Sequence, residues 1–330
     1  YHALVESGLL DEAAELYTDR FNEVLNYQLG AYDRIIELLK PLFTRGLEHL
    51  PSLSEARQQS GIINQLAGAY GFLGDIAQSL KLYAIKIKLD LDRKNPSALR
   101  VSLSNFANVL SDTASVAAWF HALELMRDLA PLTGDPDDLA FTHLRIMGAF
   151  VQMGQWEKAE IEYQVFTAKP PSYQTAFWLS DAEINRAMML LARGERATSV
   201  LALAWSLATQ AKDYLNQREI QRWQGEDMLL VGDPLAAEEH FQAALTMARR
   251  GGVLLADYLI NIPRVLVAQS KRDIARQMLE DINEDDMVPV QAAYVHVGMA
   301  EVWLALGVPE PKLPSFDPRK VPPVPYEKEI

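Results

Sequence analysis

Histidine is the side chain most often used for proton transfer and metal binding near neutral pH, and this chain has six isolated histidines. No two of them have the spacing of a zinc-binding H-E-x-x-H helix, and the chain has no cysteine that could complete a thiolate site. We therefore interpret the histidines as surface or packing residues and expect no metal site among them: His2, His49, His121, His143, His240 and His296.

The acidic run at 281–285 begins like a calcium-binding loop. Its sixth position is Asp286, where such a loop needs a glycine to turn, and its twelfth is Ala292, where it needs a bidentate glutamate. We interpret the run as a solvated loop between helices. The remaining carboxylates form no recognisable catalytic pair, so the sequence predicts no metal and no acid–base dyad.

Phosphate-binding motifs are also missing from the sequence. It contains neither G-x-x-x-x-G-K-[ST] nor G-x-G-x-x-G after a strand pattern. We expect no catalytic residue, no cofactor-binding residue and no enzymatic activity. An enzyme with an unrecognised active site is the least favoured of three hypotheses for this chain.

Composition narrows the class of partner. The chain has 330 residues, 49% of them hydrophobic, and a formal charge of −13, which argues against binding nucleic acid or an anionic membrane surface. No apolar run is long enough to span a bilayer. Residues 1–11 lack the basic and apolar regions of a signal peptide, and the absence of cysteine fits a reducing compartment, so we expect a cytoplasmic location.

An internal repeat predicts the elements that would position any site. A glycine or serine is followed five residues later by a small or aliphatic residue and nine residues later by a bulky one. After Gly30, these anchors follow one another at steps of 37 to 44 residues. The anchors are Gly8, Gly30, Gly74, Ser111, Gly154, Gly194, Gly232 and Ser270, and Gly307 closes a last half-repeat.

The repeat has the pattern of antiparallel helix pairs. A glycine ends the first helix, where a positive φ is easiest for glycine, and the small residue lets the second helix approach the first. Pro51, Pro96, Pro131 and Pro170 are expected to mark the stops of second helices. Strand patterns are absent, so the fold class is all-α, an α-α superhelix.

The ends of the chain depart from the repeat. The step from Gly8 to Gly30 is too short for two helices, so residues 1–29 are expected to form an irregular N-terminal cap of a solenoid spanning 1–308. Pro263 should kink or shorten its helix. Seven prolines within 309–330 predict an extended C-terminal tail, which either lies against the solenoid or is a loose terminus.

The repeat resembles the tetratricopeptide repeat (TPR). The resemblance is carried by Gly232-Asp233-Pro234 with Phe241, by Gly74-Asp75 with Tyr83, and by Gly154-Gln155-Trp156 with Tyr163, although most steps here exceed the roughly 34 residues of that repeat. The longer period and the segments after Gly8 and Gly30 resemble the C-terminal sensor arms of bacterial signal-transduction ATPases of the STAND/NB-ARC type. That resemblance implies that a ligand bound to the arm relieves inhibition of an ATPase outside this chain.

In a helix-pair solenoid the first helices line a groove, and counting back from each anchor gives the residues that should face it. Asparagines there can hydrogen-bond the main chain of an extended peptide, and arginines can hold carboxylates. The lysines of the peptide-carboxylate clamp found in some tetratricopeptide proteins are not present. The candidate partner-binding residues are Asn64, Asn105, Asn108, Arg222, Glu226 and Arg264.

Gly61, Gly68 and Gly71 fall on the same predicted groove face, although glycine costs roughly 1 kcal/mol within a helix. They either open space for a ligand backbone or allow close helix packing. Our first hypothesis is a non-enzymatic module that recognises a protein, a peptide or a small effector and acts as the sensor arm of a signalling ATPase. The alternative is a free-standing TPR adaptor or scaffold. The sequence predicts neither the ligand nor the oligomeric state.

Overall fold

The computed structural model describes residues 1–111, 113, 115–172, 175–250, 256–280, 282 and 289–307, with the backbone alone at 256–257 and 289–294. These residues form helices and connections, with no strand among them. The expected all-α helical solenoid is confirmed. None of the helices described is long and apolar enough to cross a membrane.

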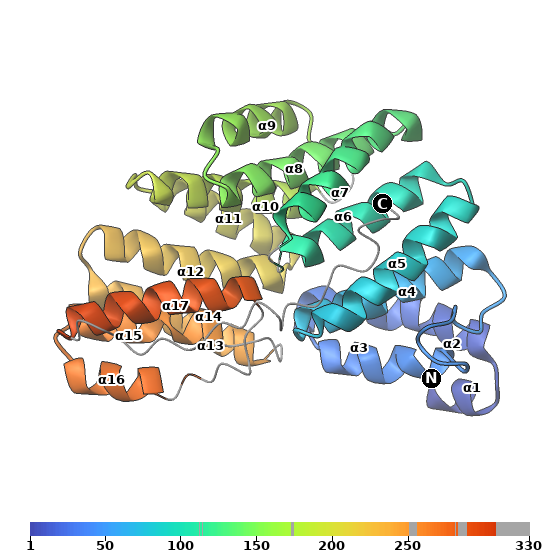
Figure 1. The fold of residues 1–330 in the computed structure, drawn as a ribbon, viewed down its shortest axis with the longest axis horizontal. Coiled ribbons are helices and arrows are strands. Elements are labelled where there is room, and N and C mark those ends of the chain that lie inside the picture. Colours follow the sequence, from blue (N-terminus) through green and yellow to red (C-terminus); the bar gives the residue numbers. More distant parts are fainter. Residues whose placement is uncertain are drawn as a thin grey trace. The chain divides into compact units, whose positions relative to one another are not determined.

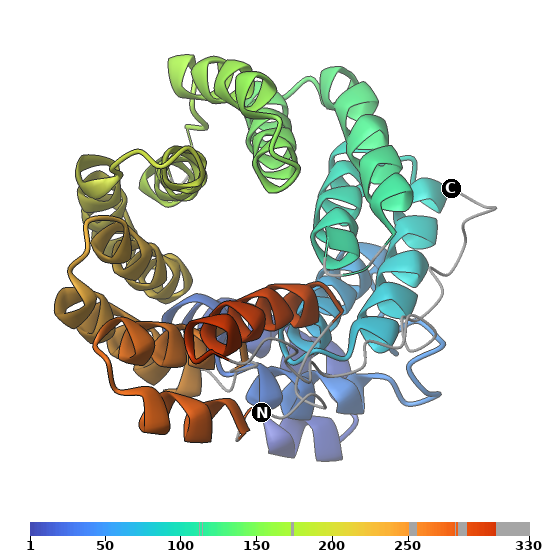
Figure 2. The same cartoon turned by 60° about the vertical axis from the view of Figure 1, so that its left-hand side comes forward.

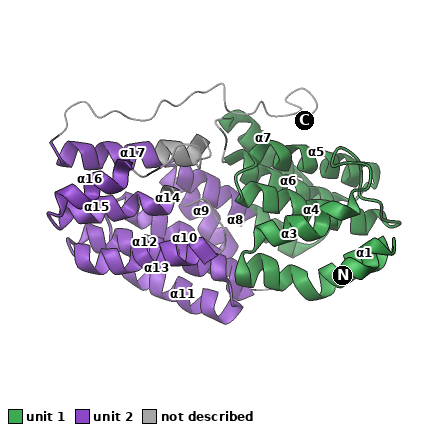
Figure 3. Ribbon diagram, turned by 90° about the horizontal axis from the view of Figure 1, so that it is seen from below, with its two compact units in different colours: residues 1–142, 319–330 green, residues 143–318 purple. Residues whose placement is uncertain are grey.

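The chain divides into two compact units, with the boundary after Thr142, inside α8 (Figure 3). Unit 1 contains the N-terminal helices, which Figure 1 colours from blue to green. They are α1 (His2–Glu6), α2 (Leu10–Leu16), α3 (Tyr32–Leu39), α4 (Ala56–Phe72), α5 (Ile76–Asp92), α6 (Pro96–Ser111), α7 (Val116–Leu129) and the start of α8 (Pro136–Gln152).

Unit 2 holds the rest of α8 and the helices that follow it, with successive hairpins lying side by side (Figure 2). These helices are α9 (Trp156–Ala168), α10 (Thr175–Ala192), α11 (Thr198–Ala211), α12 (Tyr214–Leu230), α13 (Pro234–Arg250), α14 (Ala256–Leu259), α15 (Asn261–Ala268), α16 (Arg272–Glu280) and α17 (Pro289–Ala305).

The turn between α4 and α5 shows how the repeat folds locally. Gly74 has a φ of 84°, a conformation that a side chain disfavours. The N–H of Gly74 donates to the carbonyl of Gly71 at 3.0 Å and that of Asp75 to Tyr70 at 2.9 Å, which satisfies two carbonyls at the end of α4. The carboxylate of Asp75 then accepts from the N–H of Gln78 and caps α5.

The predicted role of the anchors as helix ends is confirmed at most positions. Positive φ values occur at Gly8, Gly30, Gly154, Gly194, Gly232 and Gly307, and also at Ser270, where φ is 64°. Ser270 therefore adopts the left-handed conformation, which is strained because serine has a β-carbon. The serine follows α15 as the glycines follow their helices.

The small and bulky positions of the repeat pack the two helices of a hairpin together. A β-carbon placed on Gly225 of α12 would lie 2.5 Å from the ring of Phe241, which is 1% exposed. In unit 1, a β-carbon on Gly68 of α4 would lie 3.5 Å from the hydroxyl of Tyr83, which is an ordinary contact. Close approach of the backbones thus lets an aromatic ring fill the interior of each hairpin.

The repeat prediction was wrong at two anchors. After Ser111, the position five residues later is Val116, which is 54% exposed. After Gly194, the position nine residues later is Leu203, which is 49% exposed. The reason is the length of the turn: α7 and α11 begin at Val116 and Thr198, whereas α5 begins only two residues after its anchor. The extra turn residues rotate a different face of each second helix inward.

Proline positions and chain ends complete the fold. The predicted break at Pro263 is confirmed, because the expected helix is split into α14 and α15 around Ile260. Residues 1–29 form α1, α2 and two π-helical segments, Tyr17–Phe21 and Val24–Leu29. The predicted C-terminal tail at 309–330 lies outside the described residues. So does the acidic run at 281–285, except for Ile282.

Candidate binding site

The six predicted contact residues fall on first helices of their hairpins, three in each unit. Asn64 lies on α4, and Asn105 and Asn108 lie on α6. The other three are in unit 2: Arg222 and Glu226 on α12, and Arg264 on α15.

Asn64 and Asn105 meet across the α4–α6 interface. The Nδ2 of Asn105 donates to the Oδ1 of Asn64 at 2.8 Å, and both side chains are half-buried. This bond leaves the amide N–H groups of Asn64 and the carbonyl oxygen of Asn105 without a partner among the described residues. One donor and one acceptor therefore lie side by side, as required to pair with the C=O and N–H of an extended chain. Asn108 is exposed one turn further along α6.

A pocket of about 450 Å³ lies beside Asn64; we call it the α4/α6 pocket. Residues from α4, from the end of α5 and from the start of α6 line it, and they include Arg57, Gly61, Asn64, Lys86, Arg93 and Asn95. A β-carbon on Gly61 would meet no atom within 4 Å, so this glycine faces open space. Two residues of the predicted groove face, Gly61 and Asn64, thus line a cavity between consecutive first helices and the end of α5.

The three glycines of α4 have different roles. Gly61 leaves the α4/α6 pocket open, which is the outcome expected if it makes room for a ligand. A β-carbon on Gly71 would lie 3.2 Å from the Oγ of Ser79 and 3.4 Å from Val109, so close helix packing explains Gly71. Gly68 faces Tyr83 at an ordinary contact distance.

A buried polar network forms the floor of the α4/α6 pocket. The carboxylate of Asp90, 0% exposed, accepts from the Nζ of Lys86 at 2.8 Å and from the Oγ of Ser102 at 2.6 Å. Its other oxygen accepts from the Oγ of Ser60 at 2.9 Å and from Arg93 at 3.3 Å. Four donors therefore satisfy one buried carboxylate.

The side chain of Lys86 is only 3% exposed. Burial lowers the pKa of Lys86 below its ordinary value, although the hydrogen bond and the charge of Asp90 oppose that shift. The network gave no clear signal in the sequence. Lys86 and Asp90 have the i,i+4 spacing of a helical ion pair, but that spacing is usual on solvent-exposed faces and does not indicate burial.

The three predicted residues of unit 2 form ion pairs within the unit. Arg222 lies 3.4 Å from Glu219, and Arg264 binds Glu226 through both of its terminal nitrogens. The Nε of Arg264 also donates to Glu301 at 3.1 Å. We call this set of residues the α12/α15 ladder. Its arginines are already held by carboxylates of the same unit.

The pKa of Glu219 agrees with its ion pairs in the ladder. Burial alone would raise the pKa of Glu219, but the charges of Arg222 and Arg218 and the hydrogen bond from Tyr258 lower it below the usual value. The carboxylate of Glu219 therefore stays charged and offsets part of the positive charge of these two arginines.

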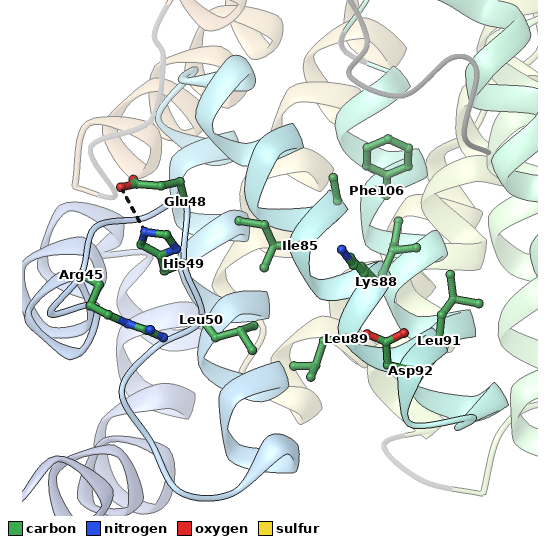
Figure 4. A pocket seen from close by; sticks show the side chains of 12 residues that line it. Arg45, Glu48, His49, Leu50, Ile85, Lys88, Leu89, Leu91, Asp92 and Phe106 are labelled. Atoms are coloured by element: carbon green, nitrogen blue, oxygen red, sulfur yellow. Dashed lines mark ion pairs between the residues drawn. The ribbon is translucent and has the colours of Figure 1, made fainter.

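A second cavity of about 650 Å³ is lined by the loop before α4, by α5 and by Phe106 of α6 (Figure 4). His49 and Leu50 of the loop before α4 face Ile85 and Leu89 of α5, and the side chains of Lys88 and Asp92 extend from α5 near Leu91. Its charged residues are of both signs: Arg45 and Lys88 with Glu48 and Asp92. We call it the α5 cleft.

Metal or acid–base chemistry gains no support from these side chains. Among the described residues, no three His, Asp or Glu groups lie close enough together to hold a metal ion. His143 and His240 have single partners, Glu162 at 2.6 Å and Gln221 at 2.9 Å. The chemistry that the α4/α6 pocket offers is hydrogen bonding and attraction of negative charge.

Comparison with known proteins shows the fold. A search of solved structures finds a Rap protein in complex with competence and sporulation factor, with a TM-score of 0.55 and 12% sequence identity. The match covers 91% of this chain and 84% of the Rap chain. At this identity the likeness shows the fold alone, and that fold is TPR-like.

Neither of the other two comparisons finds a relative. No protein-family model matches the chain, and no curated protein matches it. The resemblance to the tetratricopeptide repeat therefore rests on the repeat residues and on the structural match.

Proposed function

We propose that this chain is a non-enzymatic recognition module that binds a protein or peptide partner through the α4/α6 pocket and the adjacent Asn64–Asn105 pair. The observation that carries the proposal is the open space over Gly61 beside an unpaired amide donor and acceptor. An extended peptide presents the same two groups at each residue, so it can pair with both asparagines while a side chain enters the pocket.

The Rap protein of the same fold supports the proposal, since it was crystallised in complex with competence and sporulation factor. The α4/α6 pocket lies between consecutive first helices, where it can receive a side chain of a partner segment. A small effector with a peptide-like amide would use the same contacts.

The proposal is tested by selecting a random ten-residue peptide library on the whole chain and measuring the affinity of the selected peptides. Loss of both asparagine amides, in the double variant Asn64→Ala/Asn105→Ala, should weaken binding by roughly ten- to a hundredfold, the value of two hydrogen bonds. A matched control removes two exposed amides of unit 2, Gln210→Ala/Gln242→Ala, and should bind as the unmodified chain does.

Filling the pocket gives a second test that removes no polar group. Gly61→Leu places a side chain in the open space and should abolish peptide binding while the helices stay folded. Ala117→Leu adds the same side chain to an exposed face of α7 and serves as its control. If no peptide is selected, or if all these variants bind equally well, this function is wrong.

A finer proposal concerns the context of the module. The segments after Gly8 and Gly30, which resemble sensor arms, support a role in signal transduction as part of a larger cytoplasmic ATPase. A nucleotide-binding domain encoded upstream of Tyr1, with ATP hydrolysis that rises when the selected peptide is added, would support it. Steady hydrolysis, or no such domain, favours the free-standing adaptor or scaffold.

A further inference from the structure

The charged residues that line the α4/α6 pocket are all basic. Arg57, Lys86 and Arg93 line it, and none of its described lining residues is Asp or Glu. This is unusual in a chain whose acidic residues outnumber its basic ones by 44 to 31. The α5 cleft, for comparison, mixes both signs.

The local balance of charge stays positive once the buried carboxylate is included. Asp90 is the carboxylate that binds two of these cations, since its four donors include Lys86 and Arg93. Three cations against one carboxylate leave two positive charges. Arg57 is exposed and forms no ion pair or side-chain hydrogen bond within the described part of the chain, so its guanidinium is available to a ligand.

The start of α6 adds to the attraction for an anion. Asn95 caps this helix by accepting from the N–H of Ala98 at 3.0 Å, and Asn95, Ser97 and Ala98 all line the pocket. The N-terminal end of a 16-residue helix carries a partial positive charge, which here has the same sign as the arginines. The start of α6 and the basic side chains therefore both favour an anionic ligand.

We infer that the α4/α6 pocket binds an anionic side chain of the partner, a carboxylate or a phosphate ester, while the asparagine pair binds the neighbouring backbone. This inference rests on the proposed function and names the chemistry of the segment recognised. Arg57 makes the direct contact, and Arg93 supplies a second positive charge from the end of α5, held in place by Asp90. The space over Gly61 admits the stem of the side chain.

The test uses the random peptide library selected on the whole chain, followed by synthetic versions of the best binder. Selected sequences should be enriched in Asp or Glu at one position. Replacing that residue by Gln or Asn should weaken binding at least tenfold, whereas phosphoserine at the same position should preserve or tighten it if the natural group is a phosphate. If the peptide with Asp or Glu binds and its phosphoserine version does not, the group that the pocket recognises is a carboxylate.

Variants of the protein assign the effect to this pocket. Arg57→Gln should weaken binding of the acidic peptide about tenfold and leave the affinity for its Gln version unchanged. Arg20→Gln, which removes another exposed arginine of unit 1, should change neither affinity. Equal binding of acidic and neutral peptides by the unmodified chain would overturn this inference and leave the proposed function intact. Selection of no peptide at all would instead overturn the proposed function.

Discussion

The α4/α6 pocket of unit 1 and the α12/α15 ladder of unit 2 occupy corresponding positions of the repeat but differ in charge. Both include residues of first helices, and residues from both were predicted to contact a partner. In unit 1 the cations outnumber the neighbouring carboxylate, and Arg57 has no acidic partner among the described residues. In unit 2 Arg222 and Arg264 each pair with glutamates of the same unit.

The difference shows that residues at corresponding positions of the repeat can differ in how much of their charge is paired. An arginine offers charge to a ligand only if the residues packed around it leave that charge unsatisfied. In the ladder Arg264 joins α12, α15 and α17, whereas the pocket has a small residue, Gly61, where a side chain would otherwise fill the space.

The largest effect is expected from Asp90→Asn in unit 1. The substitution leaves Lys86 buried without a carboxylate, which should lower the free energy of unfolding by roughly 3–5 kcal/mol. Glu226→Gln in unit 2 should lower the free energy of unfolding by only about 1 kcal/mol. Arg264 is partly solvated, and it still donates hydrogen bonds to Glu301 and Asn261. Urea unfolding followed by circular dichroism measures both, and equal losses would contradict the contrast.

Unit 2 has its own buried charge in Asp213, the N-cap of α12, which is 1% exposed. Burial raises the pKa of Asp213 to about 6, helped by the charge of Asp181 and opposed by the N–H groups of residues 215–216 and by Arg218. Because the folded pKa lies above the unfolded value of 3.8, the charged form destabilises the fold above pH 6, and this loss disappears as the pH falls towards 4.

Asp213→Asn keeps an N-cap acceptor and removes the charge. The free energy of unfolding of the variant should exceed that of the unmodified chain by up to about 3 kcal/mol at pH 7.5, and the pH-dependent part of that gain should shrink towards pH 4. Urea unfolding over this pH range measures it. A difference that is constant with pH would show that Asp213 keeps an ordinary pKa in the fold.

Two helical glycines test the packing side of the comparison. Gly225→Ala in unit 2 brings a β-carbon against the ring of Phe241 and should lower the free energy of unfolding by about 2 kcal/mol. Gly61→Ala in unit 1 meets no atom and should raise it by about 0.5–1 kcal/mol through helix propensity. Thermal unfolding compares the two, and a loss of stability at Gly61 would show that the pocket is not open.

The architecture was largely predictable because hairpin turns leave local signals. The glycine anchors, the buried Phe241 and the break at Pro263 follow from steric rules that act over ten residues or fewer. The faces of α7 and α11 were predicted wrongly because their turns are longer, and a turn of different length rotates every later side chain of the helix.

The site was only partly predictable from the sequence. Asn64 and Asn105 could be placed near each other by counting from the anchors, and the structure joins them by a hydrogen bond. The roles of Arg57, Lys86 and Asp90 depend on contacts between helices that are distant in sequence, so no local pattern reveals them. The same holds for the glutamates that neutralise the ladder, which lie up to 38 residues from their arginines.

The smallest effects on stability are expected from single exposed charges. Glu301→Gln removes one partner of Arg264 and Arg57→Gln removes an unpaired cation, and each should change the free energy of unfolding by less than about 1 kcal/mol. Only Arg57→Gln should weaken binding of a selected acidic peptide. Calorimetric titration measures the peptide affinity of both variants. If Glu301→Gln weakened peptide binding as much as Arg57→Gln, the contrast between the two units would be wrong.

Amide hydrogen exchange of the whole chain, with and without the best selected peptide, tests most directly where the partner binds. Exchange should slow in α4 and α6, around Asn64 and Asn105, and should be unchanged in α12 and α15. Protection confined to α12 and α15, with α4 and α6 unaffected, would contradict a binding site at the α4/α6 pocket.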